Sequence, residues 1–331
     1  MTGLHHRWMP SVCASAVSAC LALMPLAALA QTSPAATSLL NEAGEAVSAG
    51  RYVDALAAFA GAIAESPDDA AARAKRAQLF EQLGHPDLAA ADYRVAAKLS
   101  PDDASLHKGV CLDLALANHD LDGALAACNA AVRLAPDSVD ALSARGYLQL
   151  RRGAYAEAEK DYSAVLALSP AAPGEMFGFG VALIHQGRVK EGRGEIASAT
   201  LDSSGVVSDW ESRGFGMQGE ILPGMPKTKA SQPATSLTDL KTFLNKGEAY
   251  AKLAGGCGRI VDTGAAATDV SWSGECRFGL LHGVGKLTPA GADAAPVRFA
   301  YGRVIAAGEE GAAREKTLGL AYEAAEQALA P

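Results

Sequence analysis

The sequence is poor in aromatic residues, in basic charge and in long apolar segments. Only 6% of its 331 residues are aromatic, and acidic residues outnumber basic ones by 37 to 29, which gives a formal net charge of −8. Nucleic acids and anionic membranes select clustered Lys and Arg, so we expect no nucleic-acid partner. After the N-terminal segment, no stretch is apolar and long enough for a transmembrane helix.

Motifs that carry metal or nucleophilic chemistry are also missing. The chain contains no CxxC pair, no HExxH and no GxSxG. A single Asp-Thr-Gly at 262–264 resembles part of an aspartic protease site, but one copy outside a two-lobed β-rich chain favours a loop. We therefore expect no catalytic residues, no metal and no cofactor, and a protein that is not an enzyme.

A glycine-rich stretch, WSGECRFGLLHGVGKL at 272–287, raises the question of a phosphate-binding loop. Such a loop has the pattern G-x-x-x-x-G-K-[S/T] between a strand and a helix. Gly279 and Gly285 are one residue too far apart, and Leu287 stands where a hydroxyl is required. Residues alternate with period two on either side of Gly279, which predicts a β-hairpin instead.

The first 30 residues are typical of a secretory signal peptide. A short basic start precedes an apolar stretch from about Val12 to Leu29, and small residues before Gln31 fit cleavage after Ala30. We therefore expect export across the inner membrane, into the periplasm. The alternative is a lipoprotein processed at Cys20, which would leave an apolar segment on the mature protein.

Four of the six cysteines remain after the expected cleavage. They are Cys111, Cys128, Cys257 and Cys276, which allow three pairings. Their division into two local couples favours Cys111–Cys128 and Cys257–Cys276. Both bonds are expected in an oxidising compartment.

Prolines recur at a nearly constant interval in the first half of the chain. Pro67, Pro101, Pro136 and Pro170 are 34, 35 and 34 residues apart. Small and large residues recur in the same register. The small positions are Ala43, Ala77, Cys111, Gly146 and Gly180, and the large positions are Phe59, Tyr93, Cys128, Tyr162 and Ile196. Small residues let two antiparallel helices approach closely, and proline ends the second helix of each unit.

This pattern resembles the tetratricopeptide repeat. The resemblance covers residues 36–201 as four units and a degenerate fifth, and it implies a mainly α fold, a helical-repeat solenoid. In the third unit Asn118 stands where a turn glycine is expected, and Asn tolerates the left-handed conformation.

Solenoids of this kind have a concave face lined by the first helix of each pair, and the resemblance implies a groove there for a protein or peptide. The register places seven residues on that face: Gln78, Lys108, Leu112, Ser143, Tyr147, Phe177 and Val181. The alternative for Phe177 and Val181 is that the following segment covers them.

The repeat pattern fades after residue 201. Residues 202–235 are rich in Gly, Ser and Pro and predict a linker or irregular segment, whose Trp210, Phe215 and Met217 dock on the last repeat. Residues 236–331 predict a small α+β region, a β-meander with flanking helices.

Within this C-terminal region, one helix is expected from Ser236 through Leu253 and another from about Ala312 to Leu329. The hairpin at 272–287 resembles one MORN repeat, a short β-hairpin unit, with Cys276 in place of the second aromatic residue. The positions that fit are Trp272, Gly274, Glu275, Gly279, His282, Gly283 and Gly285.

The sequence therefore predicts an exported, non-enzymatic scaffold or adaptor that binds a protein or peptide on the concave face of the solenoid. The alternative is a module associated with the cell envelope, possibly through a lipid anchor, in which the MORN-like region binds a membrane or surface component. Membrane association is expected only peripherally or by lipidation.

Overall fold

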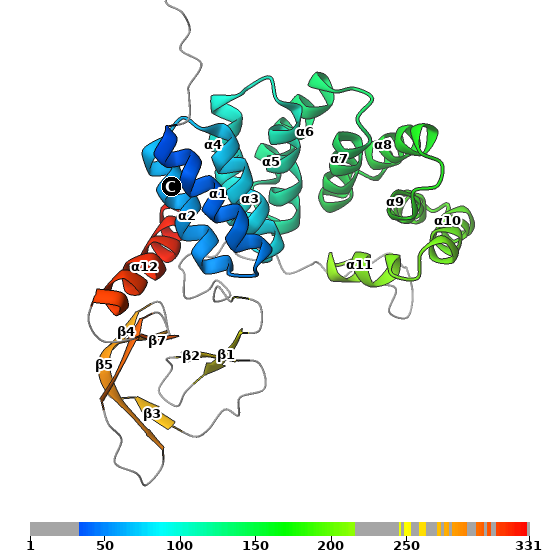
Figure 1. Ribbon diagram of the computed structural model, residues 1–331. Coiled ribbons are helices and arrows are strands. Elements are labelled where there is room, and N and C mark those ends of the chain that lie inside the picture. Colours follow the sequence, from blue (N-terminus) through cyan, green and yellow to red (C-terminus); the bar gives the residue numbers. More distant parts are fainter. Residues whose placement is uncertain are drawn as a thin grey trace, which may run out of the picture. The chain divides into compact units, whose positions relative to one another are not determined.

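The computed structural model describes residues 33–215, 245, 248–252, 258–262, 270–272, 275–277, 280–289, 296–300, 303–305 and 309–329. The expected signal peptide lies outside these residues. Between residues 33 and 215, helices α1 to α10 follow one another as antiparallel hairpins, each packed on the next (Figure 1). Their bounds are α1 (Pro34–Ser48), α2 (Tyr52–Glu65), α3 (Ala70–Gln82), α4 (Pro86–Leu99), α5 (Ala104–Ala117), α6 (Leu121–Leu134), α7 (Val139–Arg152), α8 (Tyr155–Leu168), α9 (Pro173–His185) and α10 (Val189–Asp202).

Local side-chain chemistry determines where these helices begin and end. Asp69 Oδ1 accepts a hydrogen bond of 2.9 Å from the Ala72 amide at the start of α3, and Asp103 caps α5 in the same way. The turn glycines have positive φ, which ends a helix without steric cost. They are Gly50, Gly84, Gly153 and Gly187. Asn118 has φ 52° in the third hairpin, which confirms that it replaces the glycine there.

Aromatic residues of the second helices pack against glycines of the following repeat. A Cβ added at Gly109 would lie 2.7 Å from the ring of Tyr93, and one added at Gly178 would lie 2.5 Å from the ring of Tyr162. A larger residue at either glycine would therefore separate the two repeats. The predicted register of small and large residues is confirmed, because both series are buried throughout the solenoid.

The segment after the repeats begins with a further helix, α11 (Val206–Ser212). Val206 and Trp210 are buried, one helical turn apart, so the segment has an apolar face that packs on α9 and α10. Residues 206–212 are helical, which corrects the expectation of irregular structure for that part of 202–235, and residues 216–235 lie outside the described residues. Met217 lies outside the described residues.

The C-terminal region contains strands and one described helix. The strands are β1 (Glu248–Lys252), β2 (Gly258–Asp262), β3 (Val270–Trp272), β4 (Glu275–Arg277), β5 (Leu280–Pro289), β6 (Pro296–Ala300) and β7 (Arg303–Val304), and the helix is α12 (Glu309–Leu329). Strand β5 is central: it pairs with β3, β4 and β6 in antiparallel fashion and with β2 in parallel.

The expected helix from Ser236 through Leu253 is wrong at its C-terminal end. Residues 248–252 form β1, which pairs antiparallel with β2. The tertiary pairing supplies a ladder of backbone hydrogen bonds, and it overrides the local preference for helix.

Two polar contacts join the C-terminal region to the start of α2. Asn245 Oδ1 accepts a hydrogen bond of 3.0 Å from the Val53 amide, and Arg314 of α12 forms an ion pair with Asp54. Helix α2 has no side-chain cap of its own, so Asn245 takes that role. Helix α12 also packs on α2 and α4, the second helices of the first two hairpins.

Candidate functional site

Four of the seven residues predicted for the concave face line one pocket. Lys108 and Leu112 come from α5, and Ser143 and Tyr147 come from α7. The cavity has a volume of about 280 Å³. The other residues that line it are Asp140, Ala144, Tyr162, Gly174, Glu175, Asp209, Trp210 and Arg213.

The pocket combines aromatic rings with six charged or polar side chains. Ser143 Oγ donates a hydrogen bond of 3.0 Å to Glu175 Oε1. The guanidinium carbon of Arg213 lies 5.7 Å from the ring centre of Tyr147 and 5.9 Å from that of Trp210. Burial raises the pKa of the Tyr147 hydroxyl, which therefore remains a proton donor. Aromatic walls on which polar groups converge are typical of a binding cleft.

Phe177 and Val181 are buried, so they do not belong to an open groove. The rings of Phe177 and Trp210 stack with their centroids 5.2 Å apart and an interplanar angle of 19°. Phe215 packs edge-on against Trp210, with centroids 5.5 Å apart. The structure therefore supports the alternative in which the following segment covers Phe177.

Gln78 lies outside this pocket, on α3 of the second repeat, and is exposed. It is one repeat before Leu112 in the register of the first helices. The seven predicted residues therefore fall into three groups. Gln78 is exposed, and Phe177 and Val181 are buried. The residues that line the pocket are Lys108, Leu112, Ser143 and Tyr147.

Sequence reasoning missed an acidic residue in the solenoid core. Asp113, on α5 next to Leu112, is fully buried, and its side chain is hydrogen-bonded to that of Glu81. Burial, and after it the charge of Glu81, raises the pKa of Asp113 to about 9. Burial also raises the pKa of Glu81. A comparison of equivalent positions in the repeats could have identified Asp113, because the neighbouring repeats have Leu79 and Leu148 at its position.

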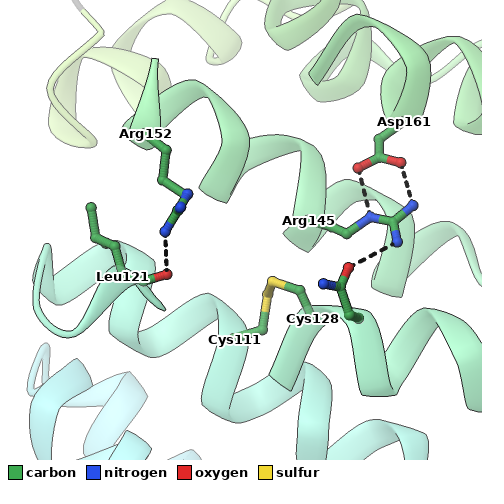
Figure 2. The surroundings of a disulfide bond; sticks show 7 residues. Cys111, Leu121, Cys128, Arg145, Arg152 and Asp161 are labelled. Carbon is green, nitrogen blue, oxygen red and sulfur yellow. Dashed lines mark hydrogen bonds and ion pairs between the residues drawn. A yellow bond between two sulfur atoms is a disulfide. The ribbon is translucent and has the colours of Figure 1, made fainter. Parts of the chain in front are cut away.

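A disulfide joins Cys111 of α5 to Cys128 of α6, as the spacing of the cysteines predicts (Figure 2). Their Cα atoms are 5.0 Å apart. The two cysteines occupy the small and large positions that Gly146 and Tyr162 occupy in the next repeat. The bond thus replaces a packing contact between the two helices of the third hairpin.

The hairpins on either side of the disulfide contain an arginine–aspartate pair instead. Arg145 donates hydrogen bonds of 2.8 and 2.6 Å to Asp161 (Figure 2), and Arg76 donates two of 2.7 Å to Asp92. Both pairs are 16 residues apart and occupy the same register. The third hairpin has Val110 and an alanine at these positions, so in these three consecutive hairpins the middle one has a disulfide where its two neighbours have the ion pair.

The glycine-rich stretch at 272–287 contains strands in the described residues. Strand β4 pairs antiparallel with β5, so that Glu275 faces His282. Lys286 lies within β5 opposite Pro296, which is a strand position and not the end of a phosphate loop. The resemblance to a MORN repeat stays a prediction.

The second predicted disulfide is only partly within the described residues. Cys276 is exposed and disulfide-bonded. Cys257 lies outside the described residues, so the pairing of Cys257 with Cys276 stays a prediction.

No group of three or more His, Cys, Asp or Glu side chains in the described residues is placed to hold a metal ion. Among the helices described, none has the length and the hydropathy to cross a bilayer.

The stacked hairpins and their concave pocket define a helical-repeat solenoid. A sequence model of the tetratricopeptide repeat matches residues 40–104 and 112–173, so the solenoid is built from tetratricopeptide repeats. No curated protein has significant similarity to the chain.

Solved structures with a similar fold were also found. MamA of Desulfovibrio magneticus RS-1 is 14% identical, with 52% of this chain and 97% of that chain covered and a TM-score of 0.48. YrrB, described as a TPR protein with an unusual peptide-binding site, is 18% identical, with 51% and 87% covered and a TM-score of 0.44. A tetratricopeptide repeat protein from Parabacteroides merdae ATCC 43184 is 17% identical, with 55% and 72% covered and a TM-score of 0.47.

Proposed function

We propose that this chain is an exported, non-enzymatic scaffold that binds a protein or peptide on the concave face of its solenoid. The observation that carries the proposal is the pocket between α5, α7 and α11, in which Lys108, Leu112, Ser143 and Tyr147 converge. A concave site with aromatic walls and convergent polar groups accommodates a large side chain of a partner.

The covered end of the groove gives the bound peptide a direction. Trp210 and Phe215 occupy the space over α9, so a ligand that enters the pocket extends from it toward α5 and α3. Gln78 is exposed on that side. We therefore expect the peptide to contact the second, third and fourth repeats.

The proposal is tested by selecting binders from a displayed library of random peptides against the full mature chain. Dissociation constants of the selected peptides are then measured for Ser143→Tyr, which fills the pocket, and for Ser163→Tyr on the exposed side of α8 as the matched control. We expect Ser143→Tyr to weaken binding by about tenfold or more and Ser163→Tyr to leave it unchanged. Equal affinity for both variants would exclude the pocket as the binding site.

Export is part of the proposal. The disulfide between Cys111 and Cys128 supports it, because such bonds persist in oxidising compartments. An intact mass that begins at Gln31, for protein purified from a periplasmic extract, is the expected result. A mass that begins at a lipid-modified Cys20 would favour the anchored form instead.

A further inference from the structure

Three aromatic residues of the solenoid surround one tryptophan of the segment that follows it. Tyr147 of α7, Tyr162 of α8 and Phe177 of α9 are buried, and together they are called the aromatic box below. Trp210 of α11 stacks on Phe177, and it meets Tyr147 and Tyr162 edge-on with centroids 6.0 and 6.5 Å apart. Trp210 is only 3% exposed, so its ring is almost completely enclosed.

Helix α11 departs from the repeat pattern in the direction that it takes. It begins where the repeat interval places the first helix of a sixth unit. The earlier first helices pack on the unit just before them: α7 on α5 and α6, and α9 on α7 and α8. Trp210 also reaches Tyr147 of α7, one unit further back, because α11 turns toward the concave face (Figure 1). Helix α11 therefore lies where a ligand of the groove would lie.

Few polar contacts fasten this segment to the solenoid. Arg151 Nη1 donates a long hydrogen bond of 3.5 Å to Arg213 O. In the described part of the chain no ion pair joins the segment to the repeats, since Arg213 pairs at 2.9 Å with Asp209 of the same helix. Helix α11 has seven residues and no side-chain cap, so it has little stability of its own. Apolar contacts, above all those of Trp210, therefore hold it in place.

The aromatic box is complementary to an aromatic ring and not to tryptophan in particular. The indole Nε1 of Trp210 is buried and has no hydrogen-bond partner among the described residues. A buried donor without an acceptor costs stability. A phenylalanine ring makes the same kinds of stacked and edge-on contacts and leaves no donor unpaired. An aromatic side chain of a partner can therefore replace Trp210 without loss of a hydrogen bond.

The aromatic box is continuous with the open pocket. Tyr147 and Tyr162 belong to the box and also line the pocket, and Trp210 lies between the two spaces. Withdrawal of Trp210 would extend the groove from Ser143 to Phe177. A ligand of the pocket would then gain the apolar surface of Phe177, which Trp210 covers in the free chain.

We infer that the aromatic box is a subsite for a Phe or Trp side chain of the partner, and that Trp210 occupies this subsite in the free chain. The inference rests on the proposed function, and it adds an anchor residue of the ligand and a device that controls access to the groove. A ligand that needs the box binds only those chains from which α11 has withdrawn. Its apparent affinity is therefore lowered by the fraction of chains that are open.

The occupant itself is the first probe. A labelled synthetic peptide of residues 203–215 is titrated into the full mature chain that carries Trp210→Ala, in which the box is vacant. We expect saturable binding with a dissociation constant about tenfold or more below that for the wild type, in which Trp210 competes. Val207→Ala keeps Trp210 and is the matched control, which should bind the peptide no better than the wild type. A peptide with alanine in place of its tryptophan should bind none of the chains.

A double variant tests whether the peptide binds in the aromatic box. Phe177→Leu keeps an apolar side chain and removes the stacked ring. Combined with Trp210→Ala, it should weaken binding of the 203–215 peptide by about fivefold relative to Trp210→Ala alone. Circular dichroism compares the helix content of the variants. An unchanged dissociation constant would place the peptide elsewhere and overturn the inference.

The wild type provides a measurement that depends on no substitution in the solenoid. Peptides are selected from a random library on the Trp210→Ala chain, and we expect an aromatic residue to be enriched at one position. When such a peptide saturates the wild type, the indole N–H of Trp210 should lose its protection from solvent exchange, because the peptide replaces it in the box. Trp272→Phe assigns the NMR signal, since the mature chain has only these two tryptophans. An indole N–H that stays protected would contradict the replacement.

The outcomes separate this inference from the proposed function. Equal binding of the 203–215 peptide by the Trp210→Ala chain and the wild type would overturn the aromatic subsite. The pocket would remain the binding site if Ser143→Tyr still weakened the library peptides. Failure to select any peptide sensitive to Ser143→Tyr would overturn the proposed function and the inference with it.

Discussion

The ring of Trp210 stacks on that of Phe177, with 5.2 Å between centroids and 19° between planes. Through this contact the segment after the repeats closes one end of the concave face. The same tryptophan lines the pocket beside Ser143 and Tyr147. Helix α11 therefore has two roles: it covers the apolar surface of α9, and it forms one wall of the candidate site.

Replacement of Trp210 by alanine should release α11 from the solenoid. Loss of a buried tryptophan costs about 3 kcal/mol, whereas Val207→Ala, at a half-buried position of the same helix, should cost about 1 kcal/mol. Urea denaturation followed by circular dichroism measures both. If Trp210→Ala and Val207→Ala had the same effect, the stacking on Phe177 would not be what holds α11.

The disulfide should stabilise the third hairpin by constraining the unfolded chain. The bonded cysteines are 17 residues apart, and a loop of that length corresponds to about 3 kcal/mol in the chain-entropy description. We expect Cys111→Ala combined with Cys128→Ala to lower the free energy of unfolding by this amount. The measurement uses variants and not a reductant, because Cys276 is also disulfide-bonded.

A second double variant provides the control for the disulfide. Cys111→Gly with Cys128→Tyr gives the third repeat the residues that pack as Gly146 and Tyr162 in the fourth. It should recover part of the loss. A double alanine variant as stable as the wild type would contradict a stabilising role for the bond.

The buried arginine–aspartate pairs should be far more sensitive than exposed ones. Arg76→Ala leaves the buried Asp92 with only the longer ion pair to Arg73, at 4.0 Å, and should cost about 3 kcal/mol. Asp122→Ala breaks the exposed pair with Arg152 and should cost less than about 1 kcal/mol. Thermal and urea unfolding of the two variants at one pH compare them. Similar losses would show that burial of the Arg76 pair has no energetic consequence.

Stability should depend on pH through Asp113. Its pKa is about 9 in the folded chain, and about 3.9 is expected for an unfolded one. Between these values the folded state retains a proton that the unfolded state has released, so the wild type loses stability as the pH rises, by up to about 1.4 kcal/mol per pH unit.

The variant Asp113→Leu isolates this contribution. Its advantage in free energy of unfolding over the wild type should be small near pH 4 and should grow toward pH 9. The same comparison with Asp137→Asn should show no such trend, because Asp137 is exposed. A constant difference between Asp113→Leu and the wild type across this range would show that Asp113 titrates normally.

The repeat part of the fold could be predicted because its signals are local and periodic. The small and large positions, the turn glycines and Asn118 at φ 52° all follow from steric rules that act within one hairpin. The start of the C-terminal region could not be predicted in this way. Residues 248–252 form a strand because β2 pairs with them, and that partner is chosen by tertiary structure.

Part of the candidate site could also be predicted, because the repeat register determines which residues share a face of the solenoid. The register placed Lys108, Leu112, Ser143 and Tyr147 on one face, and they line one pocket. The register does not show what covers a face, so the burial of Phe177 under Trp210 was left as an alternative. Asp113 was missed because only the apolar and small positions were compared between repeats.

The most direct test of a peptide-binding concave face is to map where a selected peptide binds the full mature chain. Backbone amide signals are followed by NMR during titration with the tightest peptide. The account predicts that the largest shifts cluster at Lys108, Leu112, Ser143 and Tyr147, with smaller ones toward Gln78. Shifts confined to the exposed faces of α4, α6 and α8, or to the strands after residue 248, would contradict it.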